Sequence, residues 1–237
     1  AFDIEGSFAG ETLWRRGRYE KELFPEAGSF GRSRKVALTP YRIGAEWSYE
    51  ALSHTLAVRL SLRGVSPDVN DLYLQTNYNN RVVESPELSQ HLLASVAYGY
   101  ASPKVRLGVT AFLSSATRLM SVVRYFDDLT RTYADAVVRG AGYLNIGLAV
   151  DADVAWSKYF SSQFSLTAGS YRHSRNPEVE VFSDVDNHLI ARGQSSMRGV
   201  RGKTPQLTAY GDIEFSRGGW SAKVGVKYWG FRYIEAS

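Results

Sequence analysis

The chain contains no cysteine, which excludes disulfide frameworks, thiol nucleophiles and metal sites built on thiolates. Long hydrophobic runs are also missing. Of the 237 residues 44% are hydrophobic, but no 18 of them are consecutive, and the mean hydropathy is -0.26. A transmembrane helix is therefore excluded. A transmembrane β-barrel is not excluded, because its polar lumen residues dilute the hydrophobic signal.

Helical periodicity and catalytic motifs are missing as well. No stretch combines a helical apolar repeat with capping residues, so we expect little helix. No G-x-S-x-G motif is present, and the strands whose polar faces carry carboxylates have no histidine on those faces. These carboxylates are Asp151, Asp153, Asp212 and Glu214. We therefore predict no catalytic residue and no enzyme activity, and we interpret the carboxylates as hydrated or paired with Arg59, Arg63 or Lys223.

The charge balance is basic, with a net charge of +4 and a pI of about 9.2. The basic residues gather in particular segments: Arg15, Arg16 and Arg18; Arg32, Arg34 and Lys35; Arg198, Arg201 and Lys203. A nucleic-acid interface would need an accompanying aromatic recognition motif, and none is found beside these segments. We therefore expect no nucleic-acid partner. The segments are interpreted as solvated loops, or as contacts to anionic lipid headgroups or to an anionic ligand.

What the chain has in abundance is period-2 alternation, which is typical of strands with one apolar and one polar face. In residues 142–156, "GYLNIGLAVDADVAW", every second position from Leu144 to Trp156 is apolar, while Asn145, Asp151 and Asp153 lie on the other parity. Similar patterns cover residues 2–10, 41–49, 55–63, 91–100, 105–114, 163–171, 207–216 and 220–228. The sequence therefore predicts an all-β, antiparallel protein with about nine strands.

The connections between these strands alternate in length. Short turns are predicted at 51–53, 101–103, 157–162 and 217–218, and long polar segments at 11–35, 64–90, 115–141 and 173–203. Long loops without structure are unusual in compact domains. Outer-membrane barrels combine short periplasmic turns with long extracellular loops. The alternation therefore favours an up-and-down transmembrane β-barrel.

Aromatic residues near the predicted strand ends agree with this interpretation. The predicted membrane-interface aromatics are Trp47, Tyr49, Trp156, Tyr159, Trp220 and Tyr228. Trp220 and Tyr228 share a face and lie roughly 20 Å apart along the membrane normal, close to the apolar band of about 25 Å between aromatic girdles. The core of a soluble barrel would favour aromatics in mid-strand. We therefore expect the apolar faces to contact outer-membrane lipid and the polar faces to line a wet lumen.

The strand count does not close a barrel. Bacterial barrels have even strand numbers, and lipid cannot satisfy the two open edges that nine strands would leave. The chain also begins inside a strand-like pattern and ends just after one. We therefore expect residues 1–237 to be one segment of a larger barrel domain, contributing about nine or ten of its strands.

Residues 63–74, "RGVSPDVNDLYL", carry a motif whose matching positions are Arg63, Pro67, Asp71, Leu72 and Tyr73. An asparagine-rich segment, the Pro86-Glu87 step and the strand-like "LLASVAYGY" follow it. In this order and spacing the motifs resemble the barrels of TonB-dependent outer-membrane receptors, most closely those of Bacteroidetes type. The resemblance covers about residues 40 to 233. Ser66 departs from the alanine that the family usually has before the proline.

The resemblance implies a 22-stranded barrel that an N-terminal plug domain fills. Such receptors of Gram-negative bacteria import iron chelates, haem, cobalamin or glycans with energy passed on by TonB. This chain contains neither the plug domain nor the TonB box. The plug domain and TonB are therefore expected as partners only through the parent chain. No cofactor is expected. The nutrient ligand stays open. A small complete outer-membrane channel and a soluble all-β binding module are the alternatives.

Two polar segments are candidate binding sites. His173 and His188 lie in a long connection with Asp184, Asp186 and Asn187, but the spacing matches no established metal loop, so no metal site is predicted. Haem ligation by a histidine and a simple solvated loop are the other interpretations. The stretch from Asn77 through Tyr78 and Asn79 to Asn80 is either a ligand contact or turn structure, since asparagine adopts turns readily.

Overall fold

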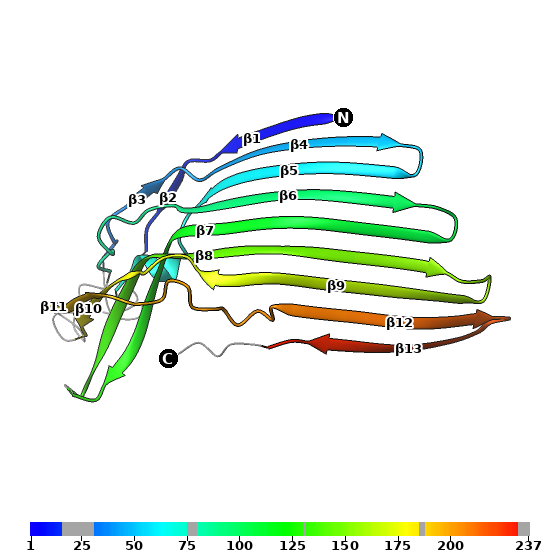
Figure 1. Cartoon of the computed structure of the whole chain (residues 1–237). Coiled ribbons are helices and arrows are strands. Elements are labelled where there is room, and N and C mark those ends of the chain that lie inside the picture. The colour runs from blue at the N-terminus through cyan, green and yellow to red at the C-terminus, as the bar shows by residue number, and fades with distance from the viewer. Residues whose placement is uncertain (16–30, 75–79, 130, 185–187, 232–237) are drawn as a thin grey trace.

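A computed structural model describes residues 1–15, 31–74, 80–129, 131–184 and 188–231 (Figure 1). The fold in these ranges is all-β, and its one helical element is the 3-10 turn η1 (Val69–Leu72). No helix in the described ranges is long and apolar enough to cross a membrane. The strands are β1 (Phe2–Phe8), β2 (Glu11–Leu13), β3 (Val36–Leu38), β4 (Tyr41–Ala51), β5 (His54–Val65), β6 (Ser89–Ala101), β7 (Val105–Asp127), β8 (Thr132–Ala155), β9 (Phe160–His173), β10 (Glu178–Ser183), β11 (Leu189–Gln194), β12 (Leu207–Arg217) and β13 (Trp220–Trp229).

The main sheet is an antiparallel meander in the order β1-β4-β5-β6-β7-β8-β9-β12-β13. All nine predicted strands are confirmed, and they follow one another across the sheet in chain order. Additional pairings join β10 to β8 and β11, and β2 to β3. Within the described residues the sheet does not close on itself, because β1 and β13 each have one sheet neighbour and form its two edges.

The four predicted short turns are confirmed, but the predicted alternation of short and long connections is wrong between β7 and β8, because β7 ends at Asp127 and β8 begins at Thr132. The tight turns after β4, β6, β8 and β12 lie at one end of the sheet, and the long connections lie at the other (Figure 1). Two predicted polar loops are wrong in detail. Residues 115–141 belong largely to β7 and β8, which continue as a protruding hairpin, and residues 173–203 contain β10 and β11. Strand structure was missed in 115–141 because bulges interrupt the period-2 pattern there.

The strand register sorts side chains onto two faces, as the alternation predicts. One row of paired residues runs Tyr49, Leu56, Tyr98, Val109, Val150, Leu166, Ala209 and Tyr228. The next row, on the opposite face, runs Glu50, Thr55, Gly99, Gly108, Asp151, Ser165, Tyr210 and Lys227. Large side chains of the apolar face are exposed: 45% of Leu148 and 76% of Val224 is accessible. The sheet is therefore not covered on its apolar face by any described part of the chain.

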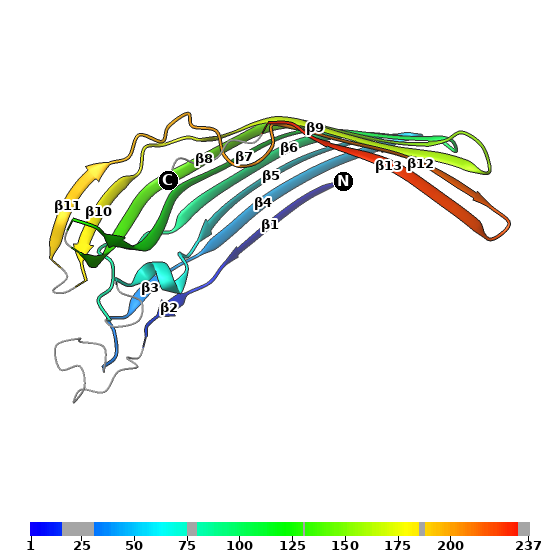
Figure 2. The ribbon, with the colours of Figure 1, turned by 90° about the horizontal axis from the view of Figure 1, so that it is seen from below.

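The buried core lies elsewhere, at the end with the long connections. The β5–β6 connection, with η1, lies on the concave side of the sheet there (Figure 2). It contributes Leu74 and Val83 to a buried cluster with Val137 of β8 and Phe182 of β10. This connection also covers a strand edge. Because β6 pairs with β7 only as far as Thr117, the farther part of β7 has an open edge, where the amide of Val122 donates to Asp71 Oδ1 over 2.9 Å.

Candidate functional site

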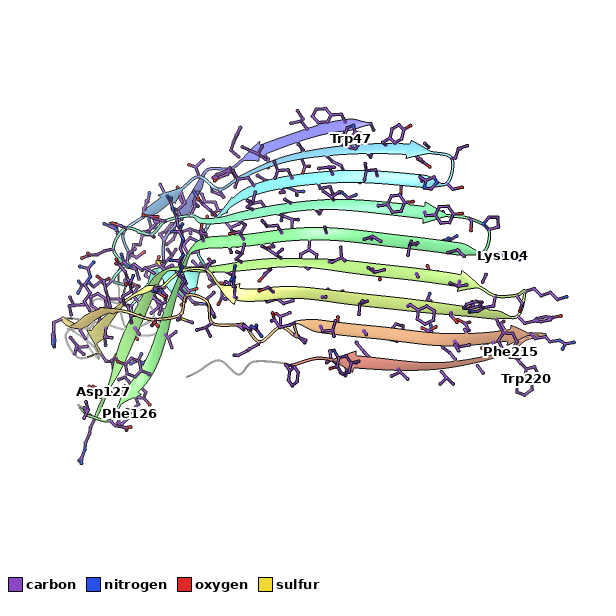
Figure 3. The ribbon with its side chains drawn as sticks, in the orientation of Figure 1. Trp47, Lys104, Phe126, Asp127, Phe215 and Trp220 are labelled. Carbon is purple, nitrogen blue, oxygen red and sulfur yellow. The ribbon has the colours of Figure 1, made fainter. Side chains whose placement is uncertain are left out.

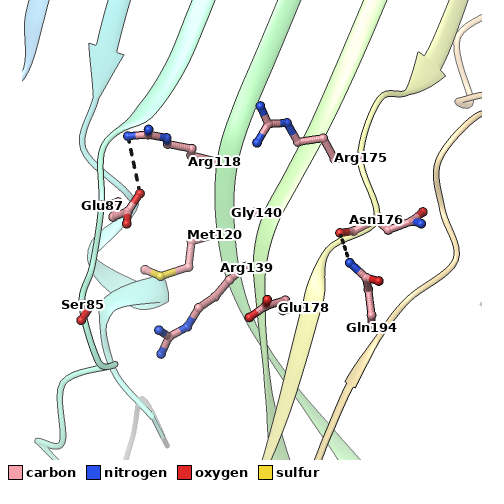
Figure 4. Close-up of a pocket in the computed structure, with 10 residues that line it drawn as sticks. All are labelled: Ser85, Glu87, Arg118, Met120, Arg139, Gly140, Arg175, Asn176, Glu178 and Gln194. Carbon is pink, nitrogen blue, oxygen red and sulfur yellow. Dashed lines mark hydrogen bonds and ion pairs between the residues drawn. The ribbon is translucent and has the colours of Figure 1, made fainter.

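A pocket of about 390 Å³ lies at the base of the protruding β7–β8 hairpin (Figure 4). Its lining comes from the β5–β6 connection, β7, β8, the β9–β10 connection, β10 and β11. The lining residues are Ser85, Glu87, Arg118, Met120, Arg139, Gly140, Arg175, Asn176, Glu178 and Gln194. The pocket therefore exists only because several long connections converge on one place in the sheet.

Backbone irregularities shape this pocket. The register between β7 and β8 shifts on both sides of Leu119, and Gly140 stands opposite one of these shifts with φ +71°. Arg118 and Ser85, which also line the pocket, have φ values of +57° and +46°. Such conformations are costly for residues with a Cβ. Bulges re-aim side chains and are frequent beside functional sites. Here they bring Arg118 and Arg139 to the same pocket.

The pocket contains mixed charge with an excess of arginine. Arg118 approaches Glu87 at 3.7 Å, and Arg139 approaches Glu180 at 3.4 Å. Arg192, outside the pocket, lies 3.6 Å from Glu178. Figure 4 shows Arg118 beside Glu87, with Arg175 extending from the β9–β10 connection. The Arg175 side chain makes no ion pair with any residue that the structure describes.

Neutral polar groups hold the rim of the pocket in place. The Oδ1 atom of Asn176 accepts hydrogen bonds from the amides of Met197 and Arg198, at 3.0 and 2.7 Å. The Nε2 atom of Gln194 donates to the carbonyl of Asn176 at 3.4 Å (Figure 4). Asn176 therefore ties the β9–β10 connection to the segment that follows β11.

A second hollow, of about 540 Å³, lies on the polar face across β1, β4 and β5. Two ion pairs lie in it, Arg42 with Glu5 at 2.6 Å and Arg59 with Glu46 at 2.9 Å. The predicted pairing of Arg59 with a carboxylate of β8 or β12 is therefore wrong, because Glu46 is its direct cross-strand neighbour.

Other carboxylates proposed from the sequence lie on the same polar face, along the strands β8 and β12. Lys223 does pair with Asp212, at 3.1 Å, as the sequence suggested. Asp151 and Asp153 are exposed on β8. Glu214 faces Lys223 across β12 and β13 in the sheet register. These side chains are spread along the sheet and do not converge on the pocket.

The predicted interface aromatics lie toward the ends of strands. Trp47 and Tyr49 of β4 stack with ring centroids 6.4 Å apart, and Trp156 donates from Nε1 to Ser162 at 2.9 Å. Trp220, 81% accessible, begins β13 at the end with the short turns (Figure 3). Two further positions are Tyr159, which lies in the turn between β8 and β9 with Arg217 over its ring, and Tyr228, near the far end of β13.

The motif positions from the resemblance lie around the buried end of the molecule. Leu72 and Tyr73 are fully buried, and the Tyr73 hydroxyl lies 3.0 Å from the Ser33 hydroxyl. Asp71 accepts the Val122 amide. Arg63 is exposed and lines the hollow on the polar face, and Pro67 is half-buried. Three of the five positions therefore have a structural explanation in packing and edge capping.

Those histidine and asparagine candidates that the structure describes do not assemble into one site. His173 is 2% accessible and packs against the Tyr143 ring at 4.6 Å, so the interpretation as a solvated loop is wrong for it. His188 is exposed, and Asp184 pairs with Arg124 at 2.5 Å. No three His, Asp or Glu side chains in the described ranges form a metal-binding group. Asp186, Asn187, Asn77, Tyr78 and Asn79 lie outside the described residues, as do Arg16 and Arg18.

One other residue of that asparagine-rich stretch is described. Asn80 donates to the carbonyl of Gly31 at 2.8 Å and accepts from Arg15 Nε at 3.1 Å. Arg15 also covers the Tyr73 ring, with its guanidinium carbon 4.2 Å from the ring centroid. This part of the stretch therefore ties the segment before β3 to the buried end of the molecule, which agrees with the structural interpretation of Asn80.

Sequence reasoning missed the arginine pocket. Arg118, Arg139 and Arg175 lie far apart in the chain, and only the sheet register brings them together. The available signal was the loss of alternation near Arg118 and Gly140, which a bulge explains better than a loop. Comparisons of the chain with protein-family models, with curated proteins and with solved structures found no match.

Proposed function

We propose that this chain is a sector of a transmembrane β-barrel in the outer membrane and belongs to a TonB-dependent receptor that takes up a nutrient. The observation that carries the proposal is the uncovered apolar face of the main sheet. An exposed apolar surface of this extent marks a contact with lipid or with another protein. Here the surface extends over strands β4 to β13, as a lipid-facing barrel wall requires.

The distribution of charge on this face supports contact with lipid. Three successive rows of paired residues on the apolar face pass through Tyr49, Trp47 and Ala45 of β4. None of the residues in these rows is charged. The ion pairs of the sheet, such as Arg59 with Glu46, lie on the polar face. In a barrel these would line the hydrated lumen.

The open edges support a barrel larger than this sheet. β1 and β13 both have unpaired backbone groups along one side, and such edges cannot face hydrocarbon. Further strands must therefore cover them in a membrane, which favours a sector of a large barrel over a small complete channel. The division into short turns at one end and long connections at the other fits the periplasmic and extracellular ends of such a barrel.

The resemblance in residues 63–74 supplies the receptor part of the proposal. It implies a plug domain and a TonB contact through the parent chain. The pocket at the base of the β7–β8 hairpin would then open at the extracellular end, where an incoming nutrient is first met. A soluble all-β module would instead need a partner over the entire apolar face.

Fractionation of source cells, with an antibody to this chain, is the first test. We expect an outer-membrane band several times larger than the 26.4 kDa of this sequence. A band near 26.4 kDa in that fraction would favour a small complete barrel. A soluble band would exclude the proposal.

Cysteine labelling tests the facing of the strands, and the lack of native cysteine removes any background. Leu148→Cys and Ala149→Cys are a matched pair, adjacent on β8 but on opposite faces. In the membrane-inserted protein we expect a water-soluble maleimide to label the cysteine at 149 and to spare the one at 148. Equal labelling at both positions would contradict the lipid-facing assignment.

A further inference from the structure

We infer that the pocket at the base of the β7–β8 hairpin binds a small solute through a carboxylate or phosphate group. Arg175, Arg118 and Arg139 would hold this group. The inference rests on the proposed function in one respect, since it makes that solute the nutrient of the receptor. The pocket itself is defined by the geometry alone.

The charge of the lining points to an anion. Three lining residues are arginines and two are glutamates. Glu87 lies beside Arg118, and Glu178 is already approached by Arg192 from outside the pocket. The positive charge of Arg175 is therefore the one that no described carboxylate compensates. An anionic ligand would complete the charge balance of the pocket.

The donors present suit an oxyanion. A guanidinium group offers its N–H donors in a planar fork that matches carboxylate and phosphate oxygens. Arg175 lines the pocket and makes no ion pair with a described residue, so its guanidinium is available for such an oxyanion.

Backbone strain is an independent observation at the same place. Among the residues that the structure describes, four other than glycine have positive φ: Leu52, Ser85, Arg118 and Arg131. Leu52 and Arg131 lie in hairpin turns, where this conformation is common. Ser85 and Arg118 do not, and both line the pocket. Strain of this kind persists where surrounding structure holds it, often at ligand sites.

The remaining lining residues describe the rest of the ligand. Ser85, Asn176 and Gln194 offer neutral hydrogen-bonding groups, and Met120 offers an apolar surface. A volume of about 390 Å³ is in the range of small-molecule pockets. A hydroxylated anion, such as a sugar acid or a sugar phosphate, combines these requirements.

Calorimetric titration of the detergent-solubilised protein with glucuronate, glucose 6-phosphate and glucose tests the inference. We expect at least one of the two anions to bind tenfold or more tightly than neutral glucose. The better of the two then distinguishes a carboxylate site from a phosphate site. No preference for either anion over glucose would overturn the inference.

Matched variants locate the binding. Arg175→Gln removes the uncompensated charge without stranding a described partner, and we expect it to weaken anion binding at least tenfold. Arg106→Gln, an equal charge change on an exposed residue at the short-turn end of β7, should leave binding unchanged. Equal binding by Arg175→Gln and the unmodified protein would place any bound anion outside this pocket.

Arg118→Gly separates a binding role from a structural one. Glycine relieves the positive φ, so the variant should unfold at a higher temperature while it binds the anion more weakly. Leu52→Gly, which relieves a positive φ in the β4–β5 turn away from the pocket, should also gain thermal stability but retain binding. If Arg118→Gly loses stability and keeps binding, Arg118 is structural and the inference is wrong for it.

The two proposals fail in different ways. Anion binding is measured on the solubilised protein, whereas the receptor proposal is tested by fractionation and cysteine labelling. A soluble protein that binds the anion through Arg175 would overturn the receptor proposal and support the site. An outer-membrane protein that ignores both anions would overturn the site alone.

Discussion

In the regular part of the sheet, from the short turns to about the middle of each strand, large apolar side chains lie on the surface. At the end with the long connections, a cluster of such side chains is buried, including Leu74, Val83 and Phe182. Leu148 illustrates the first region, and Tyr73 illustrates the second. The difference shows that the regular part lacks a protein core within the described residues, while the other end has one of ordinary globular type.

The two regions should therefore respond differently to their surroundings. A core residue is stabilised by neighbouring side chains, so its contribution should be the same in lipid and in detergent. An apolar residue on an uncovered face is stabilised only when lipid or a partner covers it. Four substitutions test this contrast, and each has a smaller expected effect than the one before it.

Tyr73→Ala should be the most damaging. It removes a fully buried ring and the hydrogen bond between the Tyr73 and Ser33 hydroxyls. We expect a loss of about 3–5 kcal/mol in the free energy of unfolding, typical of truncating a buried aromatic. Urea unfolding in lipid and in detergent measures it, and the loss should be the same in both. A loss found only in lipid would contradict the assignment of Tyr73 to an ordinary core.

Leu148→Arg should show the opposite dependence on surroundings. In lipid bilayers we expect a cost of roughly 2–4 kcal/mol, the penalty for arginine at the midplane of a lipid-facing strand. Ala149→Arg, adjacent on β8 but on the polar face, should cost less. Folding titrations of both variants into lipid vesicles measure the difference. Reversed costs would show that the two faces have been assigned the wrong way round.

Gly147→Ala tests packing on the polar face, where Phe112 stands out among polar neighbours. A Cβ at Gly147 would lie 2.5 Å from Phe112 Cζ and 2.7 Å from the carbonyl oxygen of Ala168. We expect a loss of about 1–3 kcal/mol from overpacking. Gly193→Ala on β11 is the control, since nothing lies within 4 Å of its Cβ position. Thermal unfolding of the two variants measures the difference between their losses of stability.

Asp71→Ala should have the smallest effect. It removes the acceptor for the Val122 amide on the open edge of β7, which should cost about 1 kcal/mol. Hydrogen exchange at Val122 is the sensitive measurement, and we expect faster exchange there than in the unmodified protein. Asp153→Ala, an exposed carboxylate on β8, is the control. Unchanged exchange at Val122 would show that the edge is protected by other means.

The strands and their faces could be predicted from the sequence because period-2 alternation is a local property. Residues 142–156 indicate their two faces without reference to any neighbour, and the register confirms this sorting. Phe112 was an exception to the pattern, and its contact with Gly147 on the adjacent strand explains it.

The pocket could not be predicted in the same way. Arg118 and Arg139 come together through bulges, which remove the periodicity that sequence reasoning depends on. Arg175 joins them from a connection whose course depends on the pairing of β10 with β8. The pairing of β10 with β11 was missed because both strands are short and lie within a polar segment.

The chain-order arrangement of the main sheet has a consequence for how the molecule is made. The pairs β4–β5, β6–β7, β7–β8, β8–β9 and β12–β13 join across short turns, so each can form from a local hairpin with little loss of chain entropy. Long-range closure is needed mainly for β1 with β4, β5 with β6 and β9 with β12. Assembly can therefore proceed by adding whole hairpins to a growing edge, and most of the waiting time falls on the steps that close the long connections.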